Sequence, residues 1–432
     1  MKWIDTTVGE YCPFVYGKSL PQRNRENGNV PVYGSNGIVD YHNTPHVKGC
    51  GIIIGRKGSV GAIHLSKGEF WPIDTSFYIE KDSIEELYFA YYLLKSLGLE
   101  HMNSDSAVPG LNRDNAHALA IRIPENSDDR KLLGSWISKF DEKIELNTQA
   151  SQTLEQIAQA LFKSWFVDFD PVKAKIEALA AGGSADDTEL AAMSVISAKT
   201  LDELNSLKAS NPGAFNKLAQ TAALFPAAMQ DSELGEIPVG WEVKLSGEIM
   251  DVRDGTHDSP RRSEVGYPLV TSKHITTGVL ALKDAYLISE EDYLKINKRS
   301  NVSQGDILLT MIGTVGIAYL VSQNKVDFAI KNVGLFRTSE MPLIRSYFFM
   351  LLKSEQMQSY LDARMAGTTQ KYLSLKALRT LEVLVPPDEI LTEFNWHANS
   401  VLESIFSNVT ESEALSNLRD ALLPELLAGK LI

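Results

Sequence analysis

The chain has 432 residues, 44% of them apolar and 22% charged, with a net charge of −13; at about 100–200 residues per domain, this length predicts roughly two to four domains. The composition excludes a disordered chain, and two cysteines are too few for a disulfide framework. Apolar runs such as Ile52–Ile54 are far shorter than the ~20 residues of a membrane-spanning helix. Because residues 1–5 also lack the apolar core of a secretory signal, we expect a cytoplasmic protein with no membrane partner.

The net negative charge alone argues against nucleic-acid binding, but the charge is distributed unevenly along the chain. Residues 1–127 carry 12 Lys and Arg against 14 Asp and Glu, and residues 238–387 carry 18 against 16. Residues 128–237 carry 10 against 17, and residues 388–432 carry 2 against 8. The two near-neutral segments can present basic loops to phosphate, whereas the acidic segments are poor candidates for contact with DNA.

An internal repeat matches this alternation of charge. Ile52–Leu65 aligns with Ile307–Leu320, and each predicts a buried strand, a turn with two glycines three residues apart, and a second strand. Further on, Leu111–Pro124 aligns with Leu373–Pro386, and each ends in an alternating strand that precedes a long helix. The period of about 260 residues is far too long for a solenoid, so it indicates the duplication of a domain together with its helix.

The two long helices are the clearest predicted elements. Apolar residues recur at alternating spacings of four and three over residues 131–165 and again over residues 391–423. This pattern predicts coiled-coil helices that pair with each other, although two ordinary core-facing helices would look similar. A polar residue interrupts the seam at the same place in both, Asn147 in the first and Asn408 in the second, and a polar seam residue fixes register at a cost in stability.

The segment between the first long helix and the second globular domain has a different character. Asp168–Pro171 is predicted to end the helix, because proline disfavours helix at the residue before it. Asp186–Ala223 predicts short helices that break at Asn211–Gly213. Leu234–Gly240 predicts a turn that leads into the strand Trp241–Leu245.

Common catalytic motifs are missing from the sequence. Gly17-Lys18-Ser19 lacks the first glycine of a phosphate-binding loop, since Cys12 occupies that position. His42 and His46 have the spacing of metal ligands, but a proline between them and the lack of a Cys/His cluster favour ordinary loop histidines. No motif of an amino-methyltransferase or of a serine hydrolase is present. We therefore expect that the chain is not itself an enzyme.

Several segments resemble the specificity subunits of type I restriction–modification systems. Ile157–Pro171 is similar to their central conserved region, and Asp231–Trp241 is similar to the entry of their second recognition domain. Further similar segments are Val32–Ile38, Asp254–Pro260, Gly367–Gln370 and Leu422–Gly429. The resemblance covers essentially the whole chain, although residues 175–228 form a longer stretch than in many members.

This resemblance implies a fold class and an order of domains. We expect an α/β (α+β) protein in which two globular target-recognition domains are separated by two long antiparallel coiled-coil helices, with an internal pseudo-two-fold repeat. The expected segments are 1–127 for the first target-recognition domain, 128–230 for a central helical region with the helix 131–165 and a helical insertion, 231–387 for the second target-recognition domain, and 388–432 for a C-terminal helical region.

The resemblance also implies a function and partners. The chain is expected to recognise a bipartite, asymmetric site in double-stranded DNA, and to dock two methyltransferase (modification) subunits and, through them, motor–nuclease (restriction) subunits. No cofactor is expected on this chain, because S-adenosylmethionine belongs to the methyltransferase. Two alternatives stay open: a single-chain enzyme that cuts or methylates DNA, which the missing motifs disfavour, and a coiled-coil protein scaffold, which leaves the duplicated domains without a task.

Candidate DNA-contacting residues are loop side chains that suit phosphates or base edges. In the first domain they are Lys18, Arg23, Arg25, Ser35, Asn36, Arg56 and Lys57, and in the second Arg261, Arg262, Lys273, His274, Gln370, Lys371 and Tyr372. A solvated surface position is an equal alternative for any one of them. Trp165 and Phe166 are candidates for partner binding or, equally, for the packing of a helix end on the core.

Overall fold

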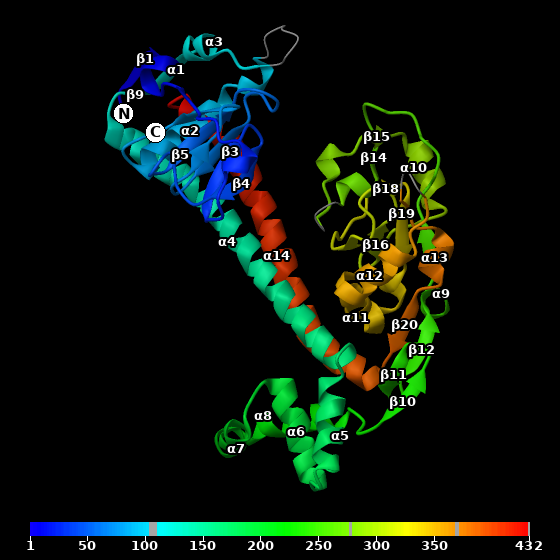
Figure 1. Ribbon diagram of the computed structural model, residues 1–432. Helices are drawn as coiled ribbons and strands as arrows, with labels where there is room; N and C mark the ends of the chain where they lie inside the picture. The colour runs from blue at the N-terminus through cyan, green and yellow to red at the C-terminus, as the bar shows by residue number, and fades with distance from the viewer. Residues whose placement is uncertain (103–109, 276–278, 368–370, 431–432) are drawn as a thin grey trace. The chain divides into compact units, whose positions relative to one another are not determined.

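The structure is a computed structural model that describes residues 1–102, 110–275, 279–367 and 371–430. The chain forms two compact units, Met1–Ala150 with Asn408–Ile432 and Ser151–Ser407. Each unit combines one mixed helix-and-sheet domain with parts of two long helices (Figure 1). Because this division crosses both long helices, it does not test the four segments expected from the sequence, which stay a prediction.

The described residues of the first unit form three small sheets. One has four strands in the order β2 (Val15–Tyr16), β8 (Ser76–Ile79), β5 (Gly51–Gly55) and β6 (Ile63–Ser66). The others are β4 (Gly37–His42), β3 (Val30–Gly34) and β7 (Trp71–Pro72), and the antiparallel pair β1 (Trp3–Thr7) and β9 (Ala120–Pro124). The short helices are α1 (Val8–Tyr11), α2 (Ile84–Ser96) and α3 (Arg113–His117). Every residue of β5 is buried, which explains its unbroken apolar sequence.

The second unit contains a domain with the same strand order. Its four-stranded sheet is β13 (Val252–Asp254), β19 (Val333–Phe336), β16 (Ile307–Thr310) and β17 (Ala318–Leu320). The others are β15 (Leu287–Ile288), β14 (Tyr267–Val270) and β18 (Ala329–Ile330), and the pair β12 (Glu242–Leu245) and β20 (Glu382–Val385). The helices are α9 (Ser246–Ile249), α10 (Glu290–Asn297), α11 (Pro342–Lys353), α12 (Glu355–Ala363) and α13 (Leu375–Arg379).

The duplication predicted from the sequence is confirmed at the level of single residue pairs. In the first unit an isolated bridge joins Lys57, in the glycine turn after β5, to Gly110. In the second unit an isolated bridge joins Ile312, in the glycine turn after β16, to Tyr372. The sequence alignment makes these two pairs equivalent, so the same backbone contact occurs in both domains.

Each sheet domain is followed by a helix of 40 residues, α4 (Ser127–Phe166) after the first and α14 (Asp388–Leu427) after the second. In the first unit they pair in antiparallel direction, since Asp141 pairs with Arg419 whereas Asn147, further along α4, contacts Ser412, earlier in α14. The predicted pairing is therefore confirmed. No helix in the described part of the chain is long and apolar enough to cross a membrane.

Trp165 and Phe166, at the end of α4, lie in the core of the second unit with only 1% and 4% of their surfaces exposed. The ring of Phe394 from α14 lies 6.2 Å from that of Trp165 and 5.0 Å from that of Phe166, and the ring of Trp241 lies 5.8 Å from that of Phe166. A partner cannot reach rings that are buried in this way. The structure therefore supports packing of the helix end on the core and does not support partner binding through these two side chains.

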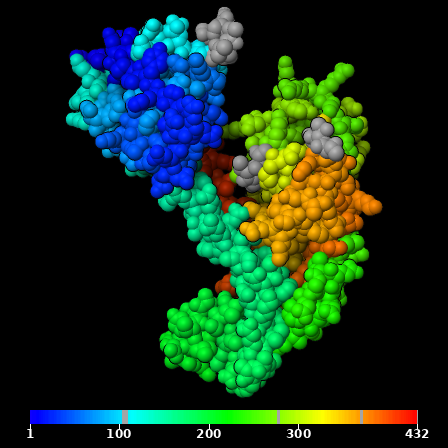
Figure 2. Space-filling model, viewed as in Figure 1, coloured from blue at the N-terminus to red at the C-terminus, as the bar shows by residue number. Residues whose placement is uncertain are grey.

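Between α4 and the second sheet domain the chain forms four short helices, α5 (Asp170–Ala180), α6 (Ala185–Ser197), α7 (Leu201–Ser210) and α8 (Pro212–Ala223). Helices α6 to α8 have a small core of their own that includes Met193, Leu204 and Phe215, and the four helices form the green lobe at the bottom of Figure 2. The predicted break is confirmed, because Asn211 caps the start of α8 and a proline follows as its first residue.

The segment before the second sheet domain corrects one prediction. Leu234–Gly240 is expected to be a turn, but its residues Gly235–Pro238 form strand β11, which pairs antiparallel with β10 (Met229–Ser232). Turns lie at both ends of this strand: at its start Gly235 has a φ of +93° and the Ser232 hydroxyl donates to its carbonyl, and after it Gly240 has a φ of +84°. A four-residue strand that ends in proline is too short to show periodicity, which explains the error.

Candidate nucleic-acid interface

The glycine turn after β5 places two predicted residues, Arg56 and Lys57, against a distant part of the first domain. The backbone N–H of Leu111 donates to the carbonyl oxygen of Arg56 at 2.8 Å, next to the bridge between Lys57 and Gly110. Gly61 ends the turn with a φ of +73°, and an added Cβ would lie 2.3 Å from neighbouring backbone atoms. Only glycine fits there, so the sequence fixes the turn that carries both cations.

A cavity of about 250 Å³ opens at this junction. This cavity is called the basic cavity below. Its aromatic lining residues are Tyr16 and Phe77, and its charged ones are Arg56, Lys57, Arg113 and Asp114. The guanidinium carbon of Arg56 lies 5.3 Å from the ring centroid of Tyr16 and 5.9 Å from that of Phe77. The guanidinium carbon of Arg113 lies 5.1 Å from the Tyr16 centroid. Cation–π contacts therefore hold both guanidinium groups at the cavity.

The positive charge of the basic cavity is largely uncompensated. Among the described residues none forms an ion pair with Arg56 or Lys57, and Nε of Arg56 is buried without a hydrogen-bond partner. Arg113 Nε lies 3.5 Å from a carboxylate oxygen of Asp114 but makes no hydrogen bond to it. The Asp114 side chain is 84% exposed, so water screens its charge. Guanidinium groups that have unpartnered donors and excess positive charge suit an anion such as a phosphate group.

The loop after β2 contains three further cationic residues predicted to contact DNA, and they differ in exposure and in their partners. Lys18 and Arg23 are exposed. Arg25 forms an ion pair with Asp40 at 3.0 Å, and its Nε donates to the carbonyl of Leu20 at 3.2 Å. The hydrogen bond from Arg25 holds the pKa of Asp40 below its usual value. Arg25 therefore fastens the loop to β4, and its predicted contact with DNA is not supported.

Ser35 and Asn36 occupy the tight turn between β3 and β4. Ser35 is buried, and its hydroxyl lies 2.7 Å from the carbonyl oxygen of Thr75 and close to that of Lys57. The hydroxyl thus braces the glycine turn from within, which does not support a DNA contact. Asn36 is exposed beside it and keeps an accessible side chain.

In the second unit, the predicted loop after β13 starts from a buried carboxylate. Asp254 is 3% exposed and accepts a hydrogen bond from the guanidinium of Arg299. Nε2 of His257 lies 3.1 Å from the other oxygen of the same carboxylate. Nδ1 of His257 in turn lies 2.8 Å from Oδ1 of Asn332. An added Cβ on Gly255 would lie 2.3 Å from a carbonyl oxygen of β18, so the backbone approaches closely there. The loop is held rigidly at its root.

The predicted side chains of the second domain are mostly accessible. The exposed ones are Arg261, Arg262, Lys273, Lys371 and Tyr372. The guanidinium carbon of Arg262 lies 5.3 Å from the ring centroid of Tyr286, which restricts its position. None of these residues lines the basic cavity.

Two predicted residues of the second domain stand apart. His274 is only 2% exposed, and its Nδ1 accepts a hydrogen bond from the backbone N–H of Thr271 at 2.9 Å. Burial lowers the pKa of His274, so a neutral imidazole that caps a turn fits this position better than a DNA contact. Gln370 lies outside the described residues.

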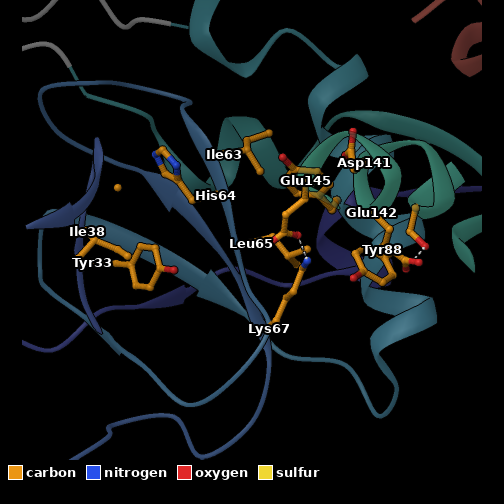
Figure 3. Close-up of a pocket in the computed structure, with 13 residues that line it drawn as sticks. Tyr33, Ile38, Ile63, His64, Leu65, Lys67, Tyr88, Asp141, Glu142 and Glu145 are labelled. Carbon is orange, nitrogen blue, oxygen red and sulfur yellow. Dashed lines mark hydrogen bonds and ion pairs between the residues drawn. The ribbon is translucent and has the colours of Figure 1, made fainter. Parts of the chain in front are cut away.

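A second cavity in the first unit, of about 480 Å³, lies between the β6 strand and helix α4 (Figure 3). Three carboxylates of α4 line it, those of Asp141, Glu142 and Glu145. Lys67 from the sheet domain pairs with Glu145, as the dashed line in Figure 3 shows. The other two carboxylates pair with Arg419 and Lys139. The lining carries three carboxylates against one lysine, so this cavity does not suit a polyanion such as DNA.

Reasoning from the sequence misses Tyr16 and Arg113. Tyr16 lies in a strand of two residues, which is too short to show a periodicity. Arg113 comes two residues after Leu111, the first residue of the aligned segment, and that proximity to the repeat was the available signal. The pairing of β2 with β8 and of β8 with β5 brings Tyr16 to Arg56, and the backbone pairing of the glycine turn with residues 110 and 111 brings Arg113 there.

Two mixed domains in one chain, each followed by a long helix, agree with comparisons to known proteins. The type I restriction–modification DNA specificity domain matches residues 1–156 and 238–417 of this chain. The chain belongs to that family. The match falls on both sheet domains and leaves out the helical lobe.

Individual relatives agree with this assignment. The chain is 33% identical over 334 residues to the type I restriction enzyme HindI specificity subunit of Haemophilus influenzae, which covers 75% of this chain and 71% of the relative. It is 26% identical to the MjaIX specificity subunit of Methanocaldococcus jannaschii, over 88% of this chain and 77% of the relative. A crystal structure of a type I system S subunit from M. genitalium superposes with a TM-score of 0.53 at 16% identity, over 99% of this chain and 96% of that one, and has the same fold.

Proposed function

We propose that this chain is the DNA-recognition subunit of a type I restriction–modification complex, in which each sheet domain recognises one half of a bipartite, asymmetric DNA sequence. The observation that carries the proposal is the double match to the specificity-domain family, once on each sheet domain. The two domains share their strand order but carry different side chains at equivalent loops. Different side chains at equivalent places favour two different half-sites, because base edges are distinguished by the groups that contact them.

The proposal extends to partners. Two similar halves favour two methyltransferase (modification) subunits for each chain, with motor–nuclease (restriction) subunits joining through them. S-adenosylmethionine and methyl transfer are assigned to the methyltransferase, so this chain selects the site without catalysing the reaction. Its place of action is then the cytoplasm, where the cell's DNA is available to it.

The proposal is tested by DNA binding and by methylation. The purified chain is measured alone and with its methyltransferase, and methylated adenines are mapped in the genomes of cells with and without it. We expect one bipartite sequence to be methylated only when the chain is present. Methylation or cleavage by the chain alone would indicate a single-chain enzyme instead, and the lack of any sequence preference with the methyltransferase would indicate a protein scaffold.

The stoichiometry is tested separately by native mass spectrometry. We expect a complex of one chain with two methyltransferase subunits. A final complex with one methyltransferase per chain would contradict the two equivalent docking surfaces.

A further inference from the structure

We propose that the basic cavity of the first unit binds one phosphate group of the DNA backbone and that the second unit has no equivalent of it. The inference rests on the proposed function, since it names a chemical group of the DNA and the domain that holds it. The two sheet domains share one fold, but under this proposal only the first binds a DNA phosphate at this position.

The chemistry of the cavity favours a phosphate over a base. A base would have to stack on the ring of Tyr16. The guanidinium groups of Arg56 and Arg113 already lie against that ring. Arg56 keeps a buried Nε without a partner, and Lys57 adds a third cation to the same lining. A neutral base would leave this charge unbalanced, whereas a phosphate offers negative charge and several acceptor oxygens.

The register of the strands assigns a counterpart to each residue of the cavity. In the first unit Tyr16 is paired with Phe77, which is paired with Ile54. In the second unit Asp254 is paired with Gly334, which is paired with Leu309. The isolated bridges extend this equivalence to the two glycine turns, and the capping residues of α3 and α13, Asn112 and Ser374, extend it to the helices. Tyr16, Arg56, Lys57, Phe77 and Arg113 thus correspond to Asp254, Met311, Ile312, Gly334 and Leu375.

None of these counterparts is a cation. Met311 is buried, and Asp254 brings a carboxylate to the place that Tyr16 occupies in the first unit. Arg299 pairs with that carboxylate and His257 contacts it, so the charge of Arg299 is engaged within the domain. Asp114, which also lines the basic cavity, corresponds to Lys376. The described counterparts therefore carry one acidic and one basic side chain, where the basic cavity carries three cations and one carboxylate.

The test measures DNA binding by the chain in complex with its methyltransferase, on a duplex that carries the methylated sequence identified in cells. The variants are Arg56→Gln and Arg113→Gln, with Lys2→Gln as a control that removes a charge from an exposed pair outside the cavity. We expect each cavity variant to bind roughly 10- to 100-fold more weakly, equally on matched and mismatched duplexes. The slope of log K against log salt should become less negative by about 1. Lys2→Gln should not reproduce this loss.

A change on the DNA side tests the same contact without altering the protein. Single phosphates are replaced one at a time by uncharged methylphosphonates across both half-sites. We expect one position, in the half-site of the first domain, to weaken binding of the unchanged complex but to have no further effect on Arg56→Gln or Arg113→Gln.

Three results would overturn the inference. Cavity variants with unchanged affinity and salt slope would show that no phosphate is held there. Relaxed preference at one base pair with an unchanged slope would show a base contact instead. If the unchanged complex had no sequence-dependent binding at all, the proposed function itself would fail, and this inference with it.

Discussion

Asn147 of α4 donates a hydrogen bond from its side-chain amide to a carboxylate oxygen of Glu411 in α14 at 2.8 Å, and the Ser412 hydroxyl lies 3.3 Å from the same nitrogen. Asn147 is only 3% exposed, so this polar contact is buried between the two helices. Hydrogen bonds from Asn147 and Lys143 lower the pKa of Glu411, which is therefore ionised at neutral pH. A buried amide whose hydrogen bonds can form in just one alignment of the two helices fixes their register.

The first prediction concerns the charge at this position. Asn147→Asp places a second carboxylate beside Glu411, so the variant should have a lower melting temperature than the unchanged chain at pH 7. The deficit should shrink as the pH falls towards 4, because protonation of one carboxylate removes the repulsion. Asn147→Leu is the control: it removes the polar contact without adding charge and should melt at the same or a higher temperature at both pH values. Equal melting of the Asp variant and the unchanged chain at pH 7 would refute the contact.

The second prediction compares two tryptophans of the second unit. Trp165→Ala should lower the free energy of unfolding by about 3–5 kcal/mol, because it empties a packed aromatic core. Trp396 is 61% exposed and contacts chiefly Lys217, whose amine lies 3.2 Å from its ring centroid, so Trp396→Ala should cost less than about 1 kcal/mol. Chemical unfolding of both variants measures the difference. Similar losses for the two would mean that Trp165 is not a core residue.

The third prediction is a pH dependence in the first unit. Glu86 of α2 is 8% exposed and accepts hydrogen bonds from Ser127 at 2.7 Å and Arg130 at 2.8 Å. Burial raises the pKa of Glu86, but these hydrogen bonds outweigh it and hold the pKa below the usual 4.5. Glu86 therefore stabilises the fold above pH 4.5, and this contribution is lost as the pH falls through the lowered value.

Glu86→Gln removes that contribution. The variant should melt at a lower temperature than the unchanged chain at pH 7, and the gap should shrink as the pH falls below 4.5 and through the lowered pKa of Glu86. A gap of constant size between pH 3 and 7 would contradict the role of the ionised carboxylate.

The fourth prediction compares two glycines of one turn. Gly58 and Gly61 both have positive φ, so alanine at either position should cost about 1–2 kcal/mol from backbone conformation alone. The new Cβ has open space at Gly58 but meets backbone atoms at 2.3 Å at Gly61. Gly61→Ala should therefore be clearly more destabilising than Gly58→Ala, and it should also weaken DNA binding because it displaces Arg56. Equal melting temperatures for the two variants would contradict the close approach.

Most of the fold follows from periodicity and repetition in the sequence. The long helices show regular apolar spacing over residues 131–165 and 391–423, and the shared glycine turn of Ile52–Leu65 and Ile307–Leu320 reveals the duplication. The hairpin of β10 and β11 escapes prediction because its strands have four residues each. Local pattern thus predicts long elements and repeated ones, but not short strands that are defined only by their partners.

The candidate site is predicted less well, because accessibility depends on tertiary contacts. Arg25 and Ser35 have the right chemistry for DNA, but an ion pair and buried hydrogen bonds engage them within the domain. Conversely, Tyr16 and Arg113 join the basic cavity through backbone pairing across more than 50 residues of sequence. Residue type alone cannot distinguish a side chain that braces a loop from one that faces a ligand.

The central claim is that each sheet domain recognises its own half of the DNA sequence, and exchange of one domain tests it most directly. Residues 1–127 are replaced by the corresponding segment of a relative with a different specificity, and methylated sites are mapped across the genome. We predict that one half of the bipartite sequence changes to that of the donor while the other half stays the same. A change in both halves, or in neither, with a folded and active complex, would contradict the claim.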